Sequence, residues 1–477
     1  MHTFRLDKER WIPVTDADGV ARTVSLVEAF SGAASLSTIG GSPLEAAAIT
    51  RFLLAIAHLT ETPTTLDAWA ALWQRRAVYM ARCAGYVQSR AWDLFDATRP
   101  FGQMPELDNT RNPAHLLVYE AARKNNAVLL DHSTEGSPRP IPAAVLARGL
   151  ITANAYAGSS GGGYRSGSLA MRTVAMLCGR TLDETLMLNL LVQSTPPAAY
   201  AWTAYGHAQD RPMDLVRRYL WTSRRVRLIP RGSEASAAEM MLGPGDEMPE
   251  SERAKDPMVA MRRDAKKTAY VPLRLEAGRA LWRSAHVLLN WHQDVRRLAA
   301  VDQLHRLVRR GLIASEQPVS MRVCAVAGEA KGPSTELWRD ESLPFGLAVI
   351  NDEQRFADLE KAVSTAEEEG RRARKRIYSF AASYLRNGAD SSPDKDDVRR
   401  LAHELSPDLT DFWGAAAPAG ERIASDGFDE AAWATLLKDA SRQAIRRAID
   451  RLPPNARRHR AEYSRQGAKM AKKGVTA

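Results

Sequence analysis

The chain has 477 residues, of which 45% are hydrophobic and 26% charged, with a formal net charge of +10 and a pI near 9.5. This length predicts two or three domains, and no apolar run approaches the roughly 18 residues of a membrane helix, which argues against a membrane protein. The basic charge favours an anionic partner such as nucleic acid, although charge alone does not identify one.

The first residues lack the apolar core of a signal peptide, so the expected location is the cytoplasm. The cysteines Cys83, Cys178 and Cys324 are far apart and show no CxxC spacing. This pattern predicts reduced thiols and argues against a disulfide framework or a cysteine zinc site. We expect neither a metal nor a cofactor.

The N-terminal region begins with a predicted hairpin. Residues 11–14 and 23–26 read as short strands on either side of a turn at Asp16-Ala-Asp-Gly19. Ser42-Pro-Leu-Glu45 is a capping box with proline at the first helical position. The apolar residues 46–59 behind it predict a buried helix.

The next 130 or so residues mix helices with loops. A second helix is predicted over residues 66–84. Prolines interrupt residues 95–142 so often that loops are expected there. Residues 144–157 and 169–191 read as helical or mixed pieces.

A glycine run, Gly158-Ser-Ser-Gly-Gly-Gly-Tyr-Arg-Ser-Gly167, separates these two pieces. Glycine has no Cβ, so such a run lets backbone N–H groups approach a phosphate or a groove closely and adopt positive φ. Tyr164 and Arg165 add stacking and charge. A flexible linker has the same composition and remains the alternative.

Basic segments follow in the second half of this region. Residues 220–229 alternate apolar and cationic positions, which predicts a half-buried strand with Arg225 and Arg227 on its outer face. Residues 232–257 read as a polar insert, and the basic cluster 262–267 is either a binding element or a solvated turn.

The C-terminal half begins with a predicted helix over residues 275–312. Residues 319–326 and 335–343 then predict two strands joined across a cationic tip at 327–333. After Pro344 the pattern is helical and predicts a bundle of about four helices.

The last stretch of the chain, residues 441–477, holds 11 Lys or Arg against 2 Asp or Glu. It is either a phosphate-facing surface or a solvated helix face. The candidate phosphate contacts are Arg446, Arg447, Arg457 and Arg458.

The expected fold class is therefore α+β, with a large mixed domain over residues 1–349 and a four-helix bundle over residues 350–477. The sequence contains no GxxxxGK[ST] or HExxH motif. These patterns favour a binding protein. The alternatives are a nucleotide- or nucleic-acid-processing enzyme that uses the glycine run as a phosphate cradle, and a structural RNA-binding protein.

The ordered set of motifs resembles CasA, the large subunit of the type I-E CRISPR surveillance complex Cascade. The motifs are Trp11-Ile-Pro-Val14, the loop Asn125 to His132, Gly161 to Gly167, Leu186 to Leu190, and Trp221 ahead of an arginine-bearing strand, followed by the bundle. The resemblance spans nearly the whole chain, and the glycine loop is its most specific part.

The resemblance implies a subunit that is not an enzyme. Members of this family sit at the 5′ end of the CRISPR RNA and read the protospacer-adjacent motif (PAM) of duplex DNA. They promote duplex opening and R-loop formation, and they dock the helicase-nuclease. The implied partners are CRISPR RNA, double-stranded target DNA, the backbone, small and handle-binding subunits of Cascade, and the helicase-nuclease, with no membrane.

The resemblance also assigns site residues. Gly161, Gly162 and Gly163, with Tyr164 and Arg165, match the loop that lies against the minor groove of the PAM, where shape-based readout suits close backbone approach. Three other family elements also map onto this chain: the cation finger to Arg262 or Arg263, the duplex wedge to Lys331, Gly332 and Pro333, and the CRISPR RNA handle loop to Asn126, Leu129, Leu130 and Asp131. The family has a lysine at the finger, a glutamine at the wedge tip and in some members an aromatic residue in the handle loop.

Overall fold

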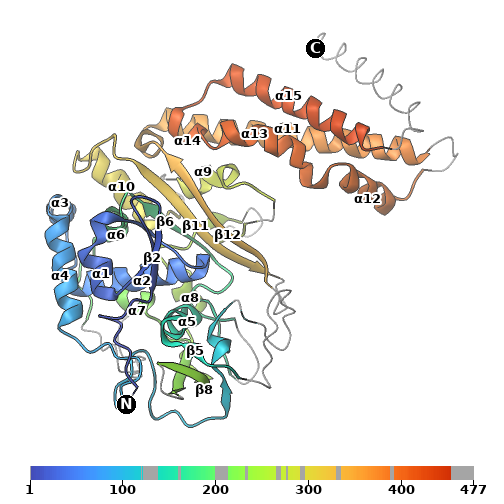
Figure 1. Ribbon diagram of the computed structural model, residues 1–477. Helices are drawn as coiled ribbons and strands as arrows, with labels where there is room; N and C mark the ends of the chain where they lie inside the picture. Colours follow the sequence, from blue (N-terminus) through green and yellow to red (C-terminus); the bar gives the residue numbers. More distant parts are fainter. Residues whose placement is uncertain are drawn as a thin grey trace. The chain divides into compact units, whose positions relative to one another are not determined.

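In the computed structural model the chain forms two compact units (Figure 1). The first unit consists of Met1–Glu276 and Val287–Leu343, and the second consists of Ala277–His286 and Pro344–Ala477. The residues that the structure describes are 2–119, 121, 138–158, 163–198, 213–230, 235–264, 270–275, 278–290, 296–328, 335–386 and 392–452. The expected α+β class is confirmed. The division differs from the expected 1–349 and 350–477 because a short segment, 277–286, packs with the helical unit.

The first unit begins with a small sheet in the order β2-β1-β3. Strands β1 (Ile12–Asp16) and β2 (Ala21–Val24) form the predicted hairpin, and β3 (Leu36–Ile39) pairs with β1 on its other side. Gly19 has φ +81° in the turn, a conformation that glycine adopts without strain. Helix α1 (Leu26–Ser31) follows the hairpin.

Helix α2 (Pro43–Thr60) is the core of this unit, and it starts at the predicted capping box of Ser42 and Glu45. It packs against α4 (Arg76–Gln88), α5 (Ala143–Tyr156), α6 (Leu182–Asn189), α7 (Leu215–Tyr219) and β11 (Val319–Gly328). Within the described residues, α2 is the one helix long and apolar enough, at a mean hydropathy of 1.2, to cross a membrane. However, 78% of it is buried inside the protein, which is the position of a core helix.

The predicted helix over residues 66–84 is two helices, α3 (Leu66–Gln74) and α4 (Arg76–Gln88). The break is at Arg75, whose N–H bonds to the carbonyl of Leu72 and closes the first helix. Apolar spacing continues across this break, which is why the sequence pattern did not reveal it.

His58 on α2 is buried, and burial lowers its pKa from 6.5 to about 3. Because the unfolded chain protonates this imidazole near pH 6.5, its contribution to stability is complete above that pH and decreases as the pH falls toward 3. The unfolding free energy of the wild type should fall as the pH decreases from 6.5 to 5. In His58→Gln we expect this fall to be smaller by up to about 1.4 kcal/mol per pH unit. Denaturant titrations at several pH values measure this slope, and the exposed His403→Gln is the control. Equal slopes in all three proteins would contradict the prediction.

The second sheet has the order β12-β11-β6. Strand β6 (Thr173–Cys178) pairs antiparallel with β11 (Val319–Gly328), and β12 (Thr335–Phe345) lies on the other side of β11 (Figure 1). The two predicted strands are thus confirmed. Of the predicted tip at 327–333, residues 327 and 328 belong to β11, and residues 329–333 lie outside the described part of the chain. Helix α6 (Leu182–Asn189) follows β6.

The third sheet is built around β8 (Ser236–Pro244), which pairs with β4 (Arg111–Pro113), β5 (Ile141–Pro142) and β7 (Arg224–Pro230). Strand β7 has the predicted alternation, with Arg225 and Arg227 facing outward. The prediction of a polar insert over residues 232–257 is wrong, because β8 is the central strand. Besides the neighbouring β7, its backbone is paired by β4 and β5, which are far away in the sequence and which no local pattern reveals. Helix α5 (Ala143–Tyr156) contacts this sheet.

The prediction of one helix over residues 275–312 is also wrong. The described part contains a 3-10 turn at Leu281–Ser284, α9 (Ala285–Leu288) and α10 (Ala299–Arg309). Ahead of them lie α7 (Leu215–Tyr219), α8 (Glu250–Arg253) and a hairpin of β9 (Met261–Arg263) and β10 (Tyr270–Pro272).

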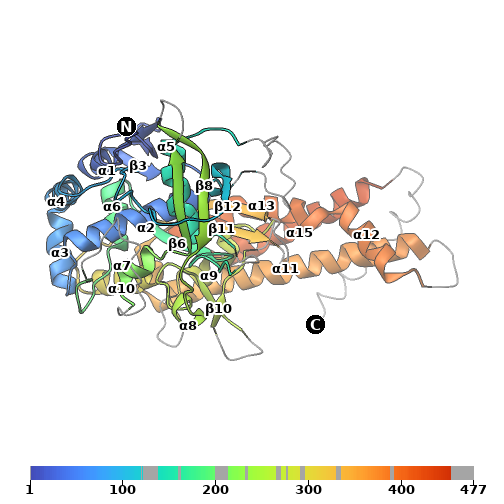
Figure 2. The same cartoon turned by 90° about the horizontal axis from the view of Figure 1, so that it is seen from below.

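The second unit is helical, with the long helix α11 (Glu353–Arg386) visible along its length in Figure 2. The other helices are α12 (Lys395–Leu405), α13 (Thr410–Gly420), α14 (Ile423–Asp426) and α15 (Glu430–Asp450). The buried side of α15 consists of Trp433, Leu437, Ala440, Ser441, Ala444 and Ala448.

Segment 277–286 is held in this helical unit by Trp282 and Arg283. Trp282 packs against Gly420, where an added Cβ would lie 2.5 Å from the indole. Arg283 pairs with Glu367 at 2.8 and 3.0 Å and lies 3.4 Å over the ring of Trp413. A tryptophan in a glycine notch and a stacked ion pair explain why this short segment packs away from its neighbours in the sequence.

Candidate nucleic-acid interface

The glycine loop is described from Gly163 onward. Gly163 has φ +83°, Tyr164 donates its hydroxyl to the carbonyl of Leu242 at 2.9 Å, and Arg165 pairs with Glu247 at 3.3 Å. The phenol of Tyr164 is therefore engaged with β8, whereas Arg165 and its partner carboxylate are both exposed. Gly161 and Gly162 lie outside the described residues.

Arg224, the first residue of β7, connects the two ends of this loop. Its guanidinium donates to the carbonyls of Arg165 at 2.6 Å and Gly158 at 2.5 Å. It also lies 5.3 Å from the ring centroid of Tyr164 and is only 6% exposed. A fixed fork of donors suits two carbonyls at once, so one buried cation holds residues 158 and 165 at a set separation.

The base of the loop leaves no room for side chains. A Cβ at Gly167 would collide with the carbonyl oxygen of Ala155, and one at Gly245 would collide with that of Thr222. Asn154 adds a polar link, because its Oδ1 accepts from the backbone N–H of Arg224 at 2.9 Å. The loop therefore leaves from a tightly packed base, which argues against the linker interpretation.

Two other candidate elements contact Thr173, the first residue of β6, which follows the glycine run by six residues in the chain. The backbone carbonyl of Thr173 accepts from the N–H of Ala260 at 3.0 Å, and its hydroxyl donates to the carbonyl of Leu273 at 2.7 Å. Ala260 and Leu273 flank the β9–β10 hairpin. Arg262 and Arg263 are exposed on β9. The basic cluster therefore begins within three residues of Ala260, which bonds to Thr173.

Strand β11, which precedes the candidate wedge in the chain, reaches the same point, because Ala325 pairs with Thr173. The basic hairpin and β11 thus both contact the start of β6, and the glycine run precedes that start in the chain. The residues predicted for the wedge and the handle loop themselves, Lys331, Gly332, Pro333, Asn126, Leu129, Leu130 and Asp131, lie outside the described part of the chain.

The C-terminal candidates differ in their surroundings. Arg446 is exposed on α15. Arg447 pairs with Asp411 at 2.9 Å, and Arg451 pairs with the same carboxylate at 2.8 Å. The charge of Arg447 is thus already engaged within the helical unit. Arg457 and Arg458 lie outside the described residues.

Sequence reasoning missed Arg224 and Asn154. The signal for Arg224 was present, because the same alternation that turns Arg225 outward turns Arg224 inward. A buried arginine needs acceptors, and here they are carbonyls of the loop. For Asn154, within an apolar helix, the sequence offered no comparable signal.

The described residues contain no group of three His, Cys, Asp or Glu side chains arranged to hold a metal ion. Burial raises the pKa of the Cys83 and Cys324 thiols to about 12 and that of Cys178 to about 11. These thiols stay protonated at neutral pH and are poor nucleophiles.

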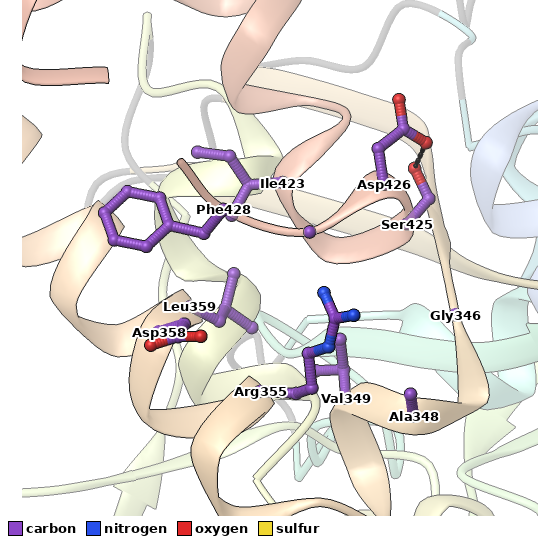
Figure 3. Close-up of a pocket in the computed structure, with 11 residues that line it drawn as sticks. Gly346, Ala348, Val349, Arg355, Asp358, Leu359, Ile423, Ser425, Asp426 and Phe428 are labelled. Atoms are coloured by element: carbon purple, nitrogen blue, oxygen red, sulfur yellow. Dashed lines mark hydrogen bonds between the residues drawn. The ribbon is translucent and has the colours of Figure 1, made fainter. Parts of the chain in front are cut away.

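One small pocket lies in the helical unit, between the start of α11 and the segment after α14 (Figure 3). The Arg355 side chain extends across it toward Gly427, and Ser425 bonds to Asp426 at 2.9 Å on the opposite wall. Its volume, about 110 Å³, is well below the roughly 300 to 1,000 Å³ of ordinary ligand pockets. This pocket does not have the size of a nucleotide site.

Comparisons with known proteins agree with this architecture. The fold matches the crystal structure of CasA from Thermus thermophilus with a TM-score of 0.79 and 23% identity, covering 98% of this chain and 99% of that one. It also matches a chain of a structure described as a CRISPR RNA-guided surveillance complex, with a TM-score of 0.72 and 17% identity over 97% of this chain and 100% of that one. The fold is therefore of the CasA/Cse1 class.

The sequence comparisons extend this from fold to family. A curated CRISPR-associated protein CasA/Cse1 of Thermus thermophilus is 28% identical over 473 residues, which covers 93% of this chain and 92% of the relative. The family model described as CRISPR-associated protein Cse1 (CRISPR_cse1) matches residues 6–452. The chain belongs to this family.

Proposed function

We propose that this protein is the non-catalytic large subunit of a type I-E CRISPR RNA-guided surveillance complex, located in the cytoplasm. In this proposal it reads the PAM of duplex DNA through the minor groove, promotes duplex opening and R-loop formation, and docks the helicase-nuclease. Its partners are CRISPR RNA, target DNA and the other Cascade subunits. Membership in the Cse1 family supports the proposal.

The observation that carries the proposal is the position of three elements around the start of β6: the glycine run precedes Thr173 by six residues, and the β9–β10 hairpin and β11 contact Thr173. The glycine loop would lie against the groove floor, the Arg262–Arg263 hairpin would enter the same groove, and the hairpin beyond β11 would separate the first base pair. PAM reading and strand separation are adjacent steps on one duplex, so their elements need a common base. The contacts of Thr173 to Ala260, Leu273 and Ala325 supply one.

Complexes assembled with and without this chain test the proposal. With the chain, we expect duplex targets to bind at least about tenfold more tightly when the correct flanking motif is present. Single-stranded targets complementary to the guide should show no such dependence, because base pairing alone recognises them. Filter binding with flank-randomised duplexes measures this ratio. Equal affinity for all flanks, or cleavage of DNA or ATP that copurifies with this chain, would overturn the proposal.

A further inference from the structure

Arg172, the residue directly before β6, is a buried cation whose donors are only partly used. It is 4% exposed, and its Nη2 bonds to Glu250 at 2.5 Å. Its Nε and Nη1 are buried without a hydrogen-bond partner. Buried donors of this kind cost free energy unless an acceptor arrives, and an orphaned guanidinium requires an explanation.

Two further arginines surround it. Arg253 pairs with the other oxygen of Glu250 at 3.3 Å and donates to the carbonyl of Ala170 at 3.3 Å. Arg296 is brought here because the N–H of Ala299 bonds to the carbonyl of Pro257 at 3.2 Å. Burial lowers the pKa of Arg253 and Arg296, and the charge of Arg172 lowers both further, whereas Glu250 raises the pKa of Arg253 and Asp256 raises that of Arg296. Positive charges are therefore held together here against their mutual repulsion.

The surrounding carboxylates do not balance this charge. Asp256 pairs with the buried Arg51 at 2.8 Å, and Glu252 pairs with Arg218 at 2.9 Å and Lys255 at 2.6 Å. That leaves Glu250 alone to serve Arg172 and Arg253, while Arg296 has no ion pair within 4.0 Å among the described residues. Glu250 itself is 66% exposed, so it lies at the mouth of the cluster.

We propose that Arg172, Arg253 and Arg296 form a phosphate site, the arginine site, that takes a backbone phosphate of the target DNA and is occupied in the free protein by the carboxylate of Glu250. A phosphate diester presents charged oxygens of the kind that arginine forks bind best. The site adjoins Thr173, where the groove-reading elements are anchored, so a bound duplex would pass within reach. This inference rests on the proposed function and adds a contact that fixes the position of the duplex.

Glu250→Gln tests whether the carboxylate of Glu250 occupies the arginine site in the free protein. The substitution removes the competing charge and keeps the shape, so the assembled complex should bind duplex target about three- to tenfold more tightly at low salt. The control is Asp67→Asn, which removes one equally exposed carboxylate from the pair that Asp67 forms with Arg310 at 3.0 Å. If Glu250→Gln and Asp67→Asn have the same effect on affinity, the occupancy by Glu250 is wrong.

Arg296→Gln tests the site itself with little risk to folding, because Arg296 is partly exposed. Binding should weaken about fivefold, and the slope of log affinity against log salt should fall by about one, as expected for one lost phosphate contact. The control is Arg310→Gln. Duplexes that each carry one uncharged methylphosphonate linkage, placed at successive positions, locate the contact. At one position the uncharged linkage should weaken binding to the wild type but not to Arg296→Gln.

The outcomes separate this inference from the proposed function. If the wild type discriminates flanking motifs while Arg296→Gln keeps its affinity and salt slope, only the arginine site is refuted. If Arg296→Gln changes thermal stabilisation by inorganic phosphate but not DNA binding, the site takes free phosphate and the assignment to DNA is overturned. If the wild type shows no flank dependence, the proposed function itself fails.

Discussion

Arg224→Gln is expected to abolish most motif-dependent binding of duplex targets while leaving single-stranded targets bound. The guanidinium is the described group that joins the carbonyls of Gly158 and Arg165. Losing two charge-assisted hydrogen bonds, at about 1.5 to 3 kcal/mol each, would release the glycine loop from its base. If about 2 to 4 kcal/mol of the lost hydrogen-bond free energy is lost from the free energy of binding, the affinity for duplex targets falls roughly 30- to 700-fold.

The controls for this prediction lie on the same strand. Arg227→Gln removes an equal charge from the exposed face of β7 and should cost less than about threefold. Arg224→Lys keeps the charge, but its ammonium group is a compact point charge and not a planar fork of donors. We therefore expect it to restore only part of the duplex affinity that Arg224→Gln loses. Titration of labelled duplex and single-stranded targets on assembled complexes measures both. Equal losses on the two substrates would mean that Arg224 supports folding or assembly rather than the loop.

The parts of the fold that the sequence predicted well are those with local causes. The hairpin around Asp16 and Gly19 depends on a turn sequence, and α2 depends on the capping box of Ser42 and Glu45. Both signals lie within a few residues of the structure that they produce. Neither needs a distant part of the chain.

The parts that were mispredicted have non-local causes. Strand β8 contains Gly243 and Pro244 and reads as an insert, yet pairing with β4, β5 and β7 makes it a central strand. Segment 277–286 reads as the start of a helix, yet the notch at Gly420 takes Trp282. Contacts with distant parts of the chain, β4 and β5 for β8 and Gly420 for Trp282, override local propensity in both cases.

The candidate site shows the same division. The glycine run was visible as composition, and its unusual backbone freedom identified it. The buried arginines were hidden, because Arg224, which holds the loop, and Arg172, which belongs to the arginine site, are two of many arginines in a basic chain. Only their burial, at 6% and 4% exposed, separates them from solvated neighbours. The resemblance to the Cse1 family supplied the order of the elements, and the contacts of Thr173 supplied a physical reason for that order.

Asp256→Asn should destabilise the first unit more than any surface change described above. Arg51 and Asp256 are each 1% exposed at the side chain and pair through two hydrogen bonds of 2.8 and 2.9 Å. The pair connects the core helix α2 to the segment that precedes β9. Removing the carboxylate leaves a buried cation without compensation, which typically costs about 3 to 5 kcal/mol.

A second variant distinguishes the loss of the pair from the loss of packing. Arg51→Met combined with Asp256→Leu removes both charges and keeps apolar volume, so we expect it to be more stable than Asp256→Asn alone. Full recovery is not expected, since Asp256 also accepts from the N–H of Met258 at 3.0 Å and Arg51 donates to the carbonyl of Arg218 at 3.2 Å. Chemical denaturation followed by tryptophan fluorescence gives the three unfolding free energies. A double variant as unstable as Asp256→Asn would show that the cost lies in those backbone contacts, and an unchanged Asp256→Asn would show that water reaches the pair and screens it.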